Sequence, residues 1–237
     1  MAFLTVVGYI LEILIFVFGI IASYLTLKKN PRYLGNIIMS SATFGLAFYS
    51  LFILLYDIIA TSWAIQIFYR IALSMILAGV IGLFFSMKVL VDSTKWFNLK
   101  MNWIPYVGWW AGFTLYMIID RGFITVLESD EIVNTQMDLI PLAVLIGSVM
   151  AVLFYSIFKL NKYGIQRSKG ISHDRMKRFA YGLLANIVAL FVNIPGQIIS
   201  DPVIGPIFDV VFFFILLIAV IIITSSFLML DHEKKTE

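Results

Sequence analysis

The sequence predicts an all-α, polytopic membrane protein with seven transmembrane helices, an outer N-terminus and a cytoplasmic C-terminus. Three observations lead to this fold class. The 237 residues are 61% hydrophobic and 13% charged, where a soluble domain carries about 25% charged residues. Apolar runs long enough to cross a hydrocarbon core of about 30 Å recur along the whole chain. Basic residues gather on alternate connections, which is the pattern that sets membrane orientation.

Each apolar run is predicted to be a helix, because lipid offers no hydrogen-bond partner to an open backbone. The runs are too long and too evenly apolar for barrel strands, which alternate. The first run is not a cleavable signal, because it is long, lacks a basic start and contains Glu12. The predicted organisation is one domain with a short cytoplasmic tail, 231–237, and no attached output domain. The spans cover residues 3–27, 33–57, 64–87, 102–120, 139–159, 176–199 and 206–230.

The basic residues fix the predicted orientation. All lysines and arginines except Arg70 and Arg121 lie in the tail or around residues 28–32, 88–100 and 159–178. The positive-inside rule makes that side cytoplasmic. The longest connection on the other side follows the fourth span and is mainly acidic, so it is predicted to be an outer loop. The chain is therefore expected to be a multi-pass protein of the cell membrane.

Composition excludes several chemistries. The chain has no cysteine, so it forms no disulfide or thiolate metal site. Its two histidines, His173 and His232, lie outside the deep parts of the spans, which excludes three-histidine zinc hydrolases and histidine-box oxygenases. A Gly-x-Ser-x-Gly motif is absent, as is a lysine in the last span for retinal. We expect no enzyme activity, no metal and no cofactor, and the net charge of +3 reflects topology rather than nucleic-acid binding.

Ionisable side chains inside a span are candidate functional residues, because lipid penalises them strongly. Helical rise places Arg70 about 9 Å and Glu12 about 9–14 Å below the outer boundary, so Glu12 is the predicted partner of Arg70. Asp57 ends the second span and Asp209 begins the seventh at the same face. Two interpretations remain open. The residues form a structural clasp, or Arg70 snorkels to the headgroups; alternatively, they bind a ligand, an ion or a proton.

The sixth span adds polar residues to this outer half. Asn186, Asn193 and Gln197 share one helix face. Pro195 removes a backbone hydrogen bond and favours a kink, so Pro195 and Gly196 are the predicted hinge. These residues line a polar cavity open to the outside, or else they form interhelical hydrogen bonds. The predicted ligand-binding residues are Glu12, Asp57, Arg70, Asn193, Gln197 and Asp209.

Small residues recur at four-residue spacing at Ala78, Gly82 and Ser86, and again at Gly108 and Gly112. Small residues at this spacing let helices approach closely. The approach is predicted inside the bundle, with a seam between two copies as the alternative, so the oligomeric state is open.

The connection between the fifth and sixth spans is strongly basic. Its stretch "ISHDRMKR" (171–178) contains Ser-His-Asp, similar to the start of the phospho-accepting box of histidine kinases, but lacks the Leu-Arg-Thr-Pro continuation. Ser172 or Asp174 as the N-cap of the sixth helix explains the stretch better. The cluster reflects topology, or it docks a cytoplasmic partner or anionic lipid. The residues predicted for docking are Lys162, Arg167, Lys169, Arg175, Lys177 and Arg178.

The overall plan resembles the seven-helix N-terminal membrane sensor region of prokaryotic histidine kinases and cyclic-dinucleotide enzymes. The likeness covers nearly the whole chain. It is carried by the basic turn "KKNPR", the aromatic third span around "FYRIALSM", the acidic outer loop, and "KRFAYGLLANIVALFVNIP" in the sixth span. The resemblance implies a sensor of small or lipophilic ligands. Because no output module is fused here, it also implies a separate signalling partner at residues 160–178.

Two functions follow as expectations. The first is a non-enzymatic receptor whose ligand, bound in the outer cavity, biases two helix arrangements. The second is a small secondary transporter or proton-coupled carrier that uses Glu12 and Arg70 as a protonation-sensitive pair. Polar residues in one half favour the receptor, because alternating-access carriers bind near the midplane.

Overall fold

A computed structural model describes residues 2–59, 61–120, 124–129, 132–137, 139–198 and 204–228. It contains seven long helices and one β-hairpin. The helices are α1 (Ala2–Lys29), α2 (Leu34–Ile59), α3 (Ser62–Asp92), α4 (Lys100–Ile119), α5 (Leu139–Lys159), α6 (Gly170–Ile198) and α7 (Ile204–Leu228). Short helical turns connect some of them: η1 (Thr94–Asn98), the π-helical turn η3 (Leu160–Gly164) and η4 (Ile165–Arg167).

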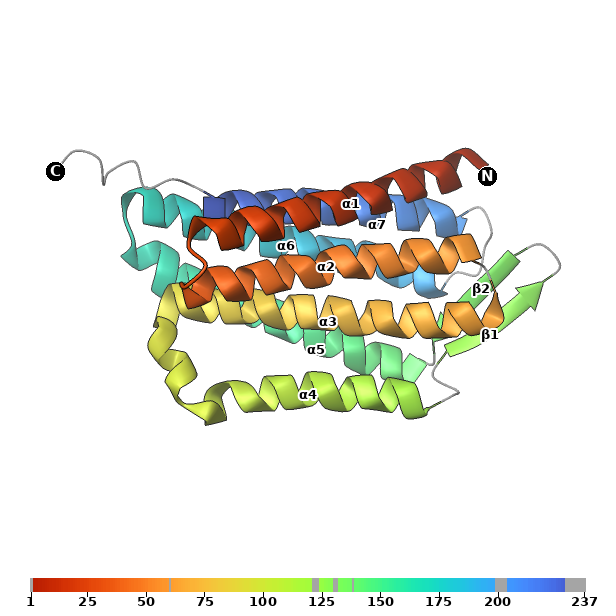
Figure 1. Cartoon of the computed structure of the whole chain (residues 1–237), viewed down its shortest axis with the longest axis horizontal. Coiled ribbons are helices and arrows are strands. Elements are labelled where there is room, and N and C mark those ends of the chain that lie inside the picture. The colour runs from red at the N-terminus through yellow and green to blue at the C-terminus, as the bar shows by residue number, and fades with distance from the viewer. Residues whose placement is uncertain are drawn as a thin grey trace.

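Six helices form a closed ring. Each of α1, α2, α3, α5, α6 and α7 packs on the next in this order, and α7 returns to α1. Helix α4 lies outside the ring, where it packs on α3 (Figure 1). The hydrophobic core fills the ring, with Leu46, Leu77 and Ile223 among its fully buried side chains.

The same six ring helices are long and apolar enough to cross a membrane. This confirms the prediction of a multi-pass helical protein. Helix α4 is not among them, because Asn102, Pro105 and several tryptophans lower its hydropathy. Tryptophan rings favour the membrane interface rather than its centre. The seventh predicted span therefore lies beside the six and differs from them in composition.

Two ends of the bundle are distinguished by the segments they carry. The hairpin end holds β1 (Ile124–Ser129) and β2 (Ile132–Met137), together with the end of α2 and the start of α7 (Figure 1). The basic end lies opposite and holds residues 30–33, η1, η3 and η4. The two strands pair antiparallel, with Ile124 opposite Met137 and Ser129 opposite Ile132. The predicted all-α fold class is confirmed, and the connection predicted to be an acidic loop contains this two-stranded hairpin.

Glycines allow a close contact between α2 and α3. A Cβ on Gly82 would lie 2.7 Å from the Cβ of Ala42, and a Cβ on Gly45 would lie 3.0 Å from the backbone N of Gly79. Close approach inside the bundle is thus confirmed for Gly82. Gly108 and Gly112 have no atom within 4 Å of a built Cβ. Their predicted role in packing within this chain is wrong, because α4 turns them away from α3.

Helix α6 begins earlier than predicted. Its first residue, Gly170, has a φ of +60°, a conformation that glycine adopts without steric cost. Ser172 and Asp174 therefore lie inside the helix and not at its N-cap, so that prediction is wrong. The Nδ1 of His173 lies 3.0 Å from the carbonyl oxygen of Ile165 and ties the start of α6 to η4.

Candidate functional site

Three carboxyl groups from three helices meet in the half of the ring nearest the hairpin end. Glu12 comes from α1, Asp57 from α2 and Asp209 from α7. They lie close enough to interact electrostatically with one another. We call this set the carboxylate cluster. The structure thus brings together three of the predicted ligand-binding residues.

Glu12 is the most enclosed member of the carboxylate cluster. Its side chain is 2% exposed, and its Oε2 is buried without a hydrogen-bond partner among the described residues. Leu11 and Ile15 flank it on the buried face of α1. The Oγ of Ser50 donates a 2.8 Å hydrogen bond to the backbone carbonyl of Glu12 and so fixes α1 against α2 at this level. A buried carboxyl oxygen without a donor is costly for the fold.

Tyrosines surround the carboxylate cluster. Tyr49 is buried and interacts electrostatically with all three carboxyl groups. Its ring lies 6.3 Å from that of Phe212, edge to face. Tyr56 and Tyr69 join α2 to α3, with ring centroids 5.7 Å apart. Tyr9 interacts electrostatically with Glu12 and Asp57. Sequence analysis missed these tyrosines, although Tyr49 and Tyr56 are seven residues apart and so share the α2 face near Asp57.

Arg70 does not pair with Glu12. Its Nη1 donates to the carbonyl oxygen of Ile118 at 3.4 Å, and its Nη2 donates to that of Asp120 at 3.3 Å. The acceptors are in the last turn of α4 and at the residue that follows it, outside the ring. The predicted Glu12–Arg70 partnership is wrong, because α4 supplies free carbonyl groups at the depth of Arg70, and helix C-termini attract cations.

The carboxylate cluster can hold positive charge. Negative charges gathered in surroundings of low polarity are unfavourable unless protons or a cation compensate them. No group of three His, Cys, Asp or Glu side chains in the described part of the chain is placed to hold a metal ion. The carboxyl groups lie near enough to interact with one another.

Comparison with known proteins gives no relative. No protein-family model matches this chain, and no curated protein sequence matches it. The resemblance to kinase sensor regions therefore stays a prediction.

Helix α6 carries two described polar side chains of the predicted set, Asn186 and Asn193. Asn186 is buried and donates to the carbonyl oxygen of Gly182 within its own helix, at 2.9 Å. Asn193 is half-buried and makes contacts of its own. Pro195 lies inside α6, which continues to Ile198. The structure does not describe the side chain of Gln197 or the surroundings of Gly196.

The predicted docking residues lie at the basic end. Five of the six are exposed, namely Lys162, Arg167, Lys169, Lys177 and Arg178, whereas Arg175 is half-buried. Exposure leaves these side chains accessible to a partner or a lipid surface. Their use by a signalling protein stays a prediction.

Sequence analysis also missed a buried cation at the basic end. Lys88 is 6% exposed, yet it was assigned to a solvated connection. Its ammonium donates to Asp92 Oδ2 at 3.1 Å and to the hydroxyl of Tyr155 at 3.3 Å. It also lies 5.3 Å from the ring centroid of Trp96 and 5.7 Å from that of Phe84. This cage of aromatic rings joins α3, η1 and α5.

Proposed function

We propose that this chain is a non-enzymatic, seven-span membrane receptor that senses a small lipophilic cation and signals through a separate cytoplasmic protein. The observation that carries the proposal is the buried carboxyl oxygen of Glu12, which lies in a cluster of three carboxyl groups and has no hydrogen-bond partner in the part of the chain that the structure describes. Proteins retain such a costly arrangement where it serves function.

Ligand chemistry follows from the groups around the cluster. Carboxylates attract an ammonium or other organic cation, and tyrosine faces stabilise the same charge through cation–π interaction. Tyr49 and Tyr69 supply such rings beside Asp209. Arg70 is engaged by α4, so it does not neutralise the cluster. A lipophilic cation would reach the site from the membrane or from the outer face.

Signalling would follow from relief of repulsion. Binding of a cation lets α1, α2 and α7 approach one another near Glu12, Asp57 and Asp209. All three helices run the full length of the ring to the basic end (Figure 1). A ligand that binds more tightly when the three helices lie closer together shifts the protein toward that arrangement. Pro195 and Gly196 are the candidate hinge in α6.

The proposal includes the orientation of the chain in the membrane and a seventh span. Positive-inside charge places the basic end in the cytoplasm and the N-terminus outside. Helix α4 then crosses the membrane beside α3 as the seventh span. The exposed basic residues at 162–178 would meet the signalling partner.

A proton-coupled carrier is the second candidate. Membrane carboxyl groups commonly form proton relays, and the carboxylate cluster favours this function as well. Carriers place their sites near the midplane, whereas Asp57 and Asp209 lie within the last and first two turns of their helices. That position favours the receptor.

Binding of tetraphenylphosphonium to the full-length protein in nanodiscs tests the receptor. We expect saturable binding that Glu12→Gln weakens by about tenfold, or about 1.4 kcal/mol. Asp174→Asn is the matched control, because Asp174 is an exposed carboxylate at the basic end and its loss should leave binding unchanged. Equal binding by wild type and Glu12→Gln would contradict the proposal. Proton-driven uptake of the same cation into vesicles would favour the carrier.

A further inference from the structure

Three cations surround one aromatic ring at the basic end. Tyr163 lies in the π-helical turn η3. The Nζ of Lys159 lies 4.5 Å from its ring centroid, the Nζ of Lys162 lies 5.4 Å from it, and the Cζ of Arg167 lies 5.0 Å from it. We call these four residues the Tyr163 cluster. A π-helical turn inserts an extra residue into the helix and is frequent at functional sites; here it gathers side chains from α5, η3 and η4.

The cluster lacks a compensating anion. None of Lys159, Lys162 and Arg167 forms an ion pair with a carboxylate in the described part of the chain; the ion pair found there joins Lys88 and Asp92. Like charges this close repel one another, and the ring face offsets only part of that repulsion. An anion held among the three cations would offset the repulsion that remains between them.

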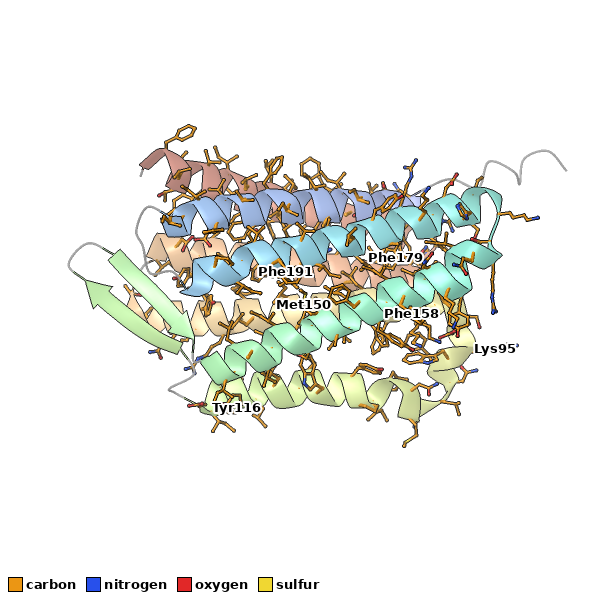
Figure 2. The ribbon with its side chains drawn as sticks, turned by 180° about the vertical axis from the view of Figure 1, so that it is seen from behind. Lys95, Tyr116, Met150, Phe158, Phe179 and Phe191 are labelled. Carbon is orange, nitrogen blue, oxygen red and sulfur yellow. The ribbon has the colours of Figure 1, made fainter. Side chains whose placement is uncertain are left out.

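The neighbouring surface identifies which anion fits. Phe154 and Phe158 are 52% and 56% exposed on α5, just before the cluster. Figure 2 shows Phe158 at the same end of the bundle as Lys95, on a different element. Lys162 lies 5.6 Å from the ring of Phe158, so apolar and cationic surfaces are continuous. At a membrane surface, exposed aromatic rings contact the lipid tails and neighbouring cations contact the headgroups. The order of aromatic rings and cations along α5 and η3 matches this arrangement.

We propose that the Tyr163 cluster binds the phosphate of an anionic lipid headgroup, with the acyl chains lying along Phe158 and Phe154. Lys162 and Arg167 donate to the phosphate oxygens, and Lys159 adds charge from below. The tyrosine ring holds the three cations in place before the lipid arrives. This site is independent of the carboxylate cluster, but it shares Lys162 and Arg167 with the basic surface proposed for the signalling partner.

The test uses the full-length protein in neutral detergent with added lipid, measured by native mass spectrometry. We expect phosphatidylglycerol to be retained in preference to phosphatidylcholine. Lys162→Gln combined with Arg167→Gln should weaken phosphatidylglycerol binding by about 25-fold, since each cation near a lipid surface contributes about fivefold. Lys95→Gln combined with Lys100→Gln is the matched control, because both lysines are exposed at the same end, and we expect it to bind as wild type does.

Several results would overturn the inference. Equal retention of the two lipids, or equal binding by wild type and the double variant at Lys162 and Arg167, means that no headgroup site exists. Competition by inorganic phosphate at the same concentration as the lipid means that a free anion is the ligand. Binding of polyglutamate without any lipid preference, lost in the same variant, means that an acidic protein segment occupies the cluster. Tyr163→Leu gives a second check, because it removes the ring and keeps all three cations, and it should also weaken phosphatidylglycerol binding.

Discussion

The Nη2 of Arg70 lies 3.3 Å from the backbone carbonyl oxygen of Asp120. This contact joins a ring helix to the one long helix that lies outside the ring. The last carbonyl groups of a helix have no partner within it, and a cation near them also interacts favourably with the helix dipole. Arg70 therefore caps α4 and holds it against α3. The Ser74 and Thr114 hydroxyls, 3.0 Å apart, and the Trp110 indole bonded to the Ser74 carbonyl continue the same junction.

Replacing Arg70 by methionine should loosen α4. The substitution keeps an unbranched apolar stem but removes both hydrogen bonds to α4. We expect a loss of about 1.5 kcal/mol, the lower end for bonds from a charged donor, seen as a lower apparent melting temperature in detergent. Cross-linking between α3 and α4 should fall as well. Lys95→Met serves as the control, and an unchanged melting temperature for Arg70→Met would remove the capping role.

Some glycines lie against a neighbouring helix, whereas others have open space where a side chain would be. Gly82→Ala would bring a methyl group to 2.7 Å from the Cβ of Ala42, and such overpacking costs about 1–3 kcal/mol. Gly112→Ala meets nothing within 4 Å and should instead stabilise α4 by about 0.5–1 kcal/mol through helix propensity. Thermal unfolding of the two variants should therefore shift in opposite directions. Shifts of the same sign would contradict this packing.

The sequence was sufficient for the helical plan but not for the hairpin. Hydropathy and backbone hydrogen-bond requirements dictate long helices wherever apolar runs occur. The segment 120–138 was read through its charges alone, while β-branched residues such as Thr125, Val126 and Val133 favour strands. The exclusion of α4 from the ring was also hidden, because helix neighbours depend on side-chain fit and not on composition.

The site was predicted in part. Depth along each span grouped Glu12, Asp57 and Asp209, and their use as a binding site stays a prediction. Depth does not give the rotation of a helix about its axis, so Arg70 was assigned to Glu12 although it faces α4. Lys88 was taken to mark the end of the third span. Its aromatic cage comes from α3, η1 and α5 and forms only when these elements pack together, so the sequence does not reveal it.

The Lys88 cage should show strong coupling between its members. Lys88→Met leaves Asp92 and the Tyr155 hydroxyl without their donor, at a cost of about 1.5–3 kcal/mol. Asp92→Asn alone leaves a buried ammonium without its negatively charged partner. The double variant should lose less than the sum of the two single variants, because neither charge then lacks its partner. Additive losses of stability in a double-mutant cycle would mean that the 3.1 Å contact contributes nothing.

Replacing Glu12 by leucine should stabilise the protein while abolishing the proposed binding of a lipophilic cation. The change removes a buried oxygen that has no hydrogen-bond partner among the residues the structure describes. It also removes charge from the carboxylate cluster, so about 1–3 kcal/mol of desolvation cost is recovered. The melting temperature should rise, and binding of tetraphenylphosphonium should be lost. Residues kept for function commonly show this opposition between stability and activity. A lower melting temperature would assign Glu12 a structural role instead.

Labelling of single cysteines should establish orientation and the number of crossings. The chain contains no cysteine, so each introduced thiol is the only target for a membrane-impermeant maleimide. Thr61→Cys at the hairpin end should react in intact cells, and Thr94→Cys and Ser172→Cys at the basic end should react only after permeabilisation. Ser129→Cys decides the status of α4: reaction in intact cells means that the chain crosses the membrane between Thr94 and Ser129, whereas protection until permeabilisation means that α4 stays on the side of the basic end.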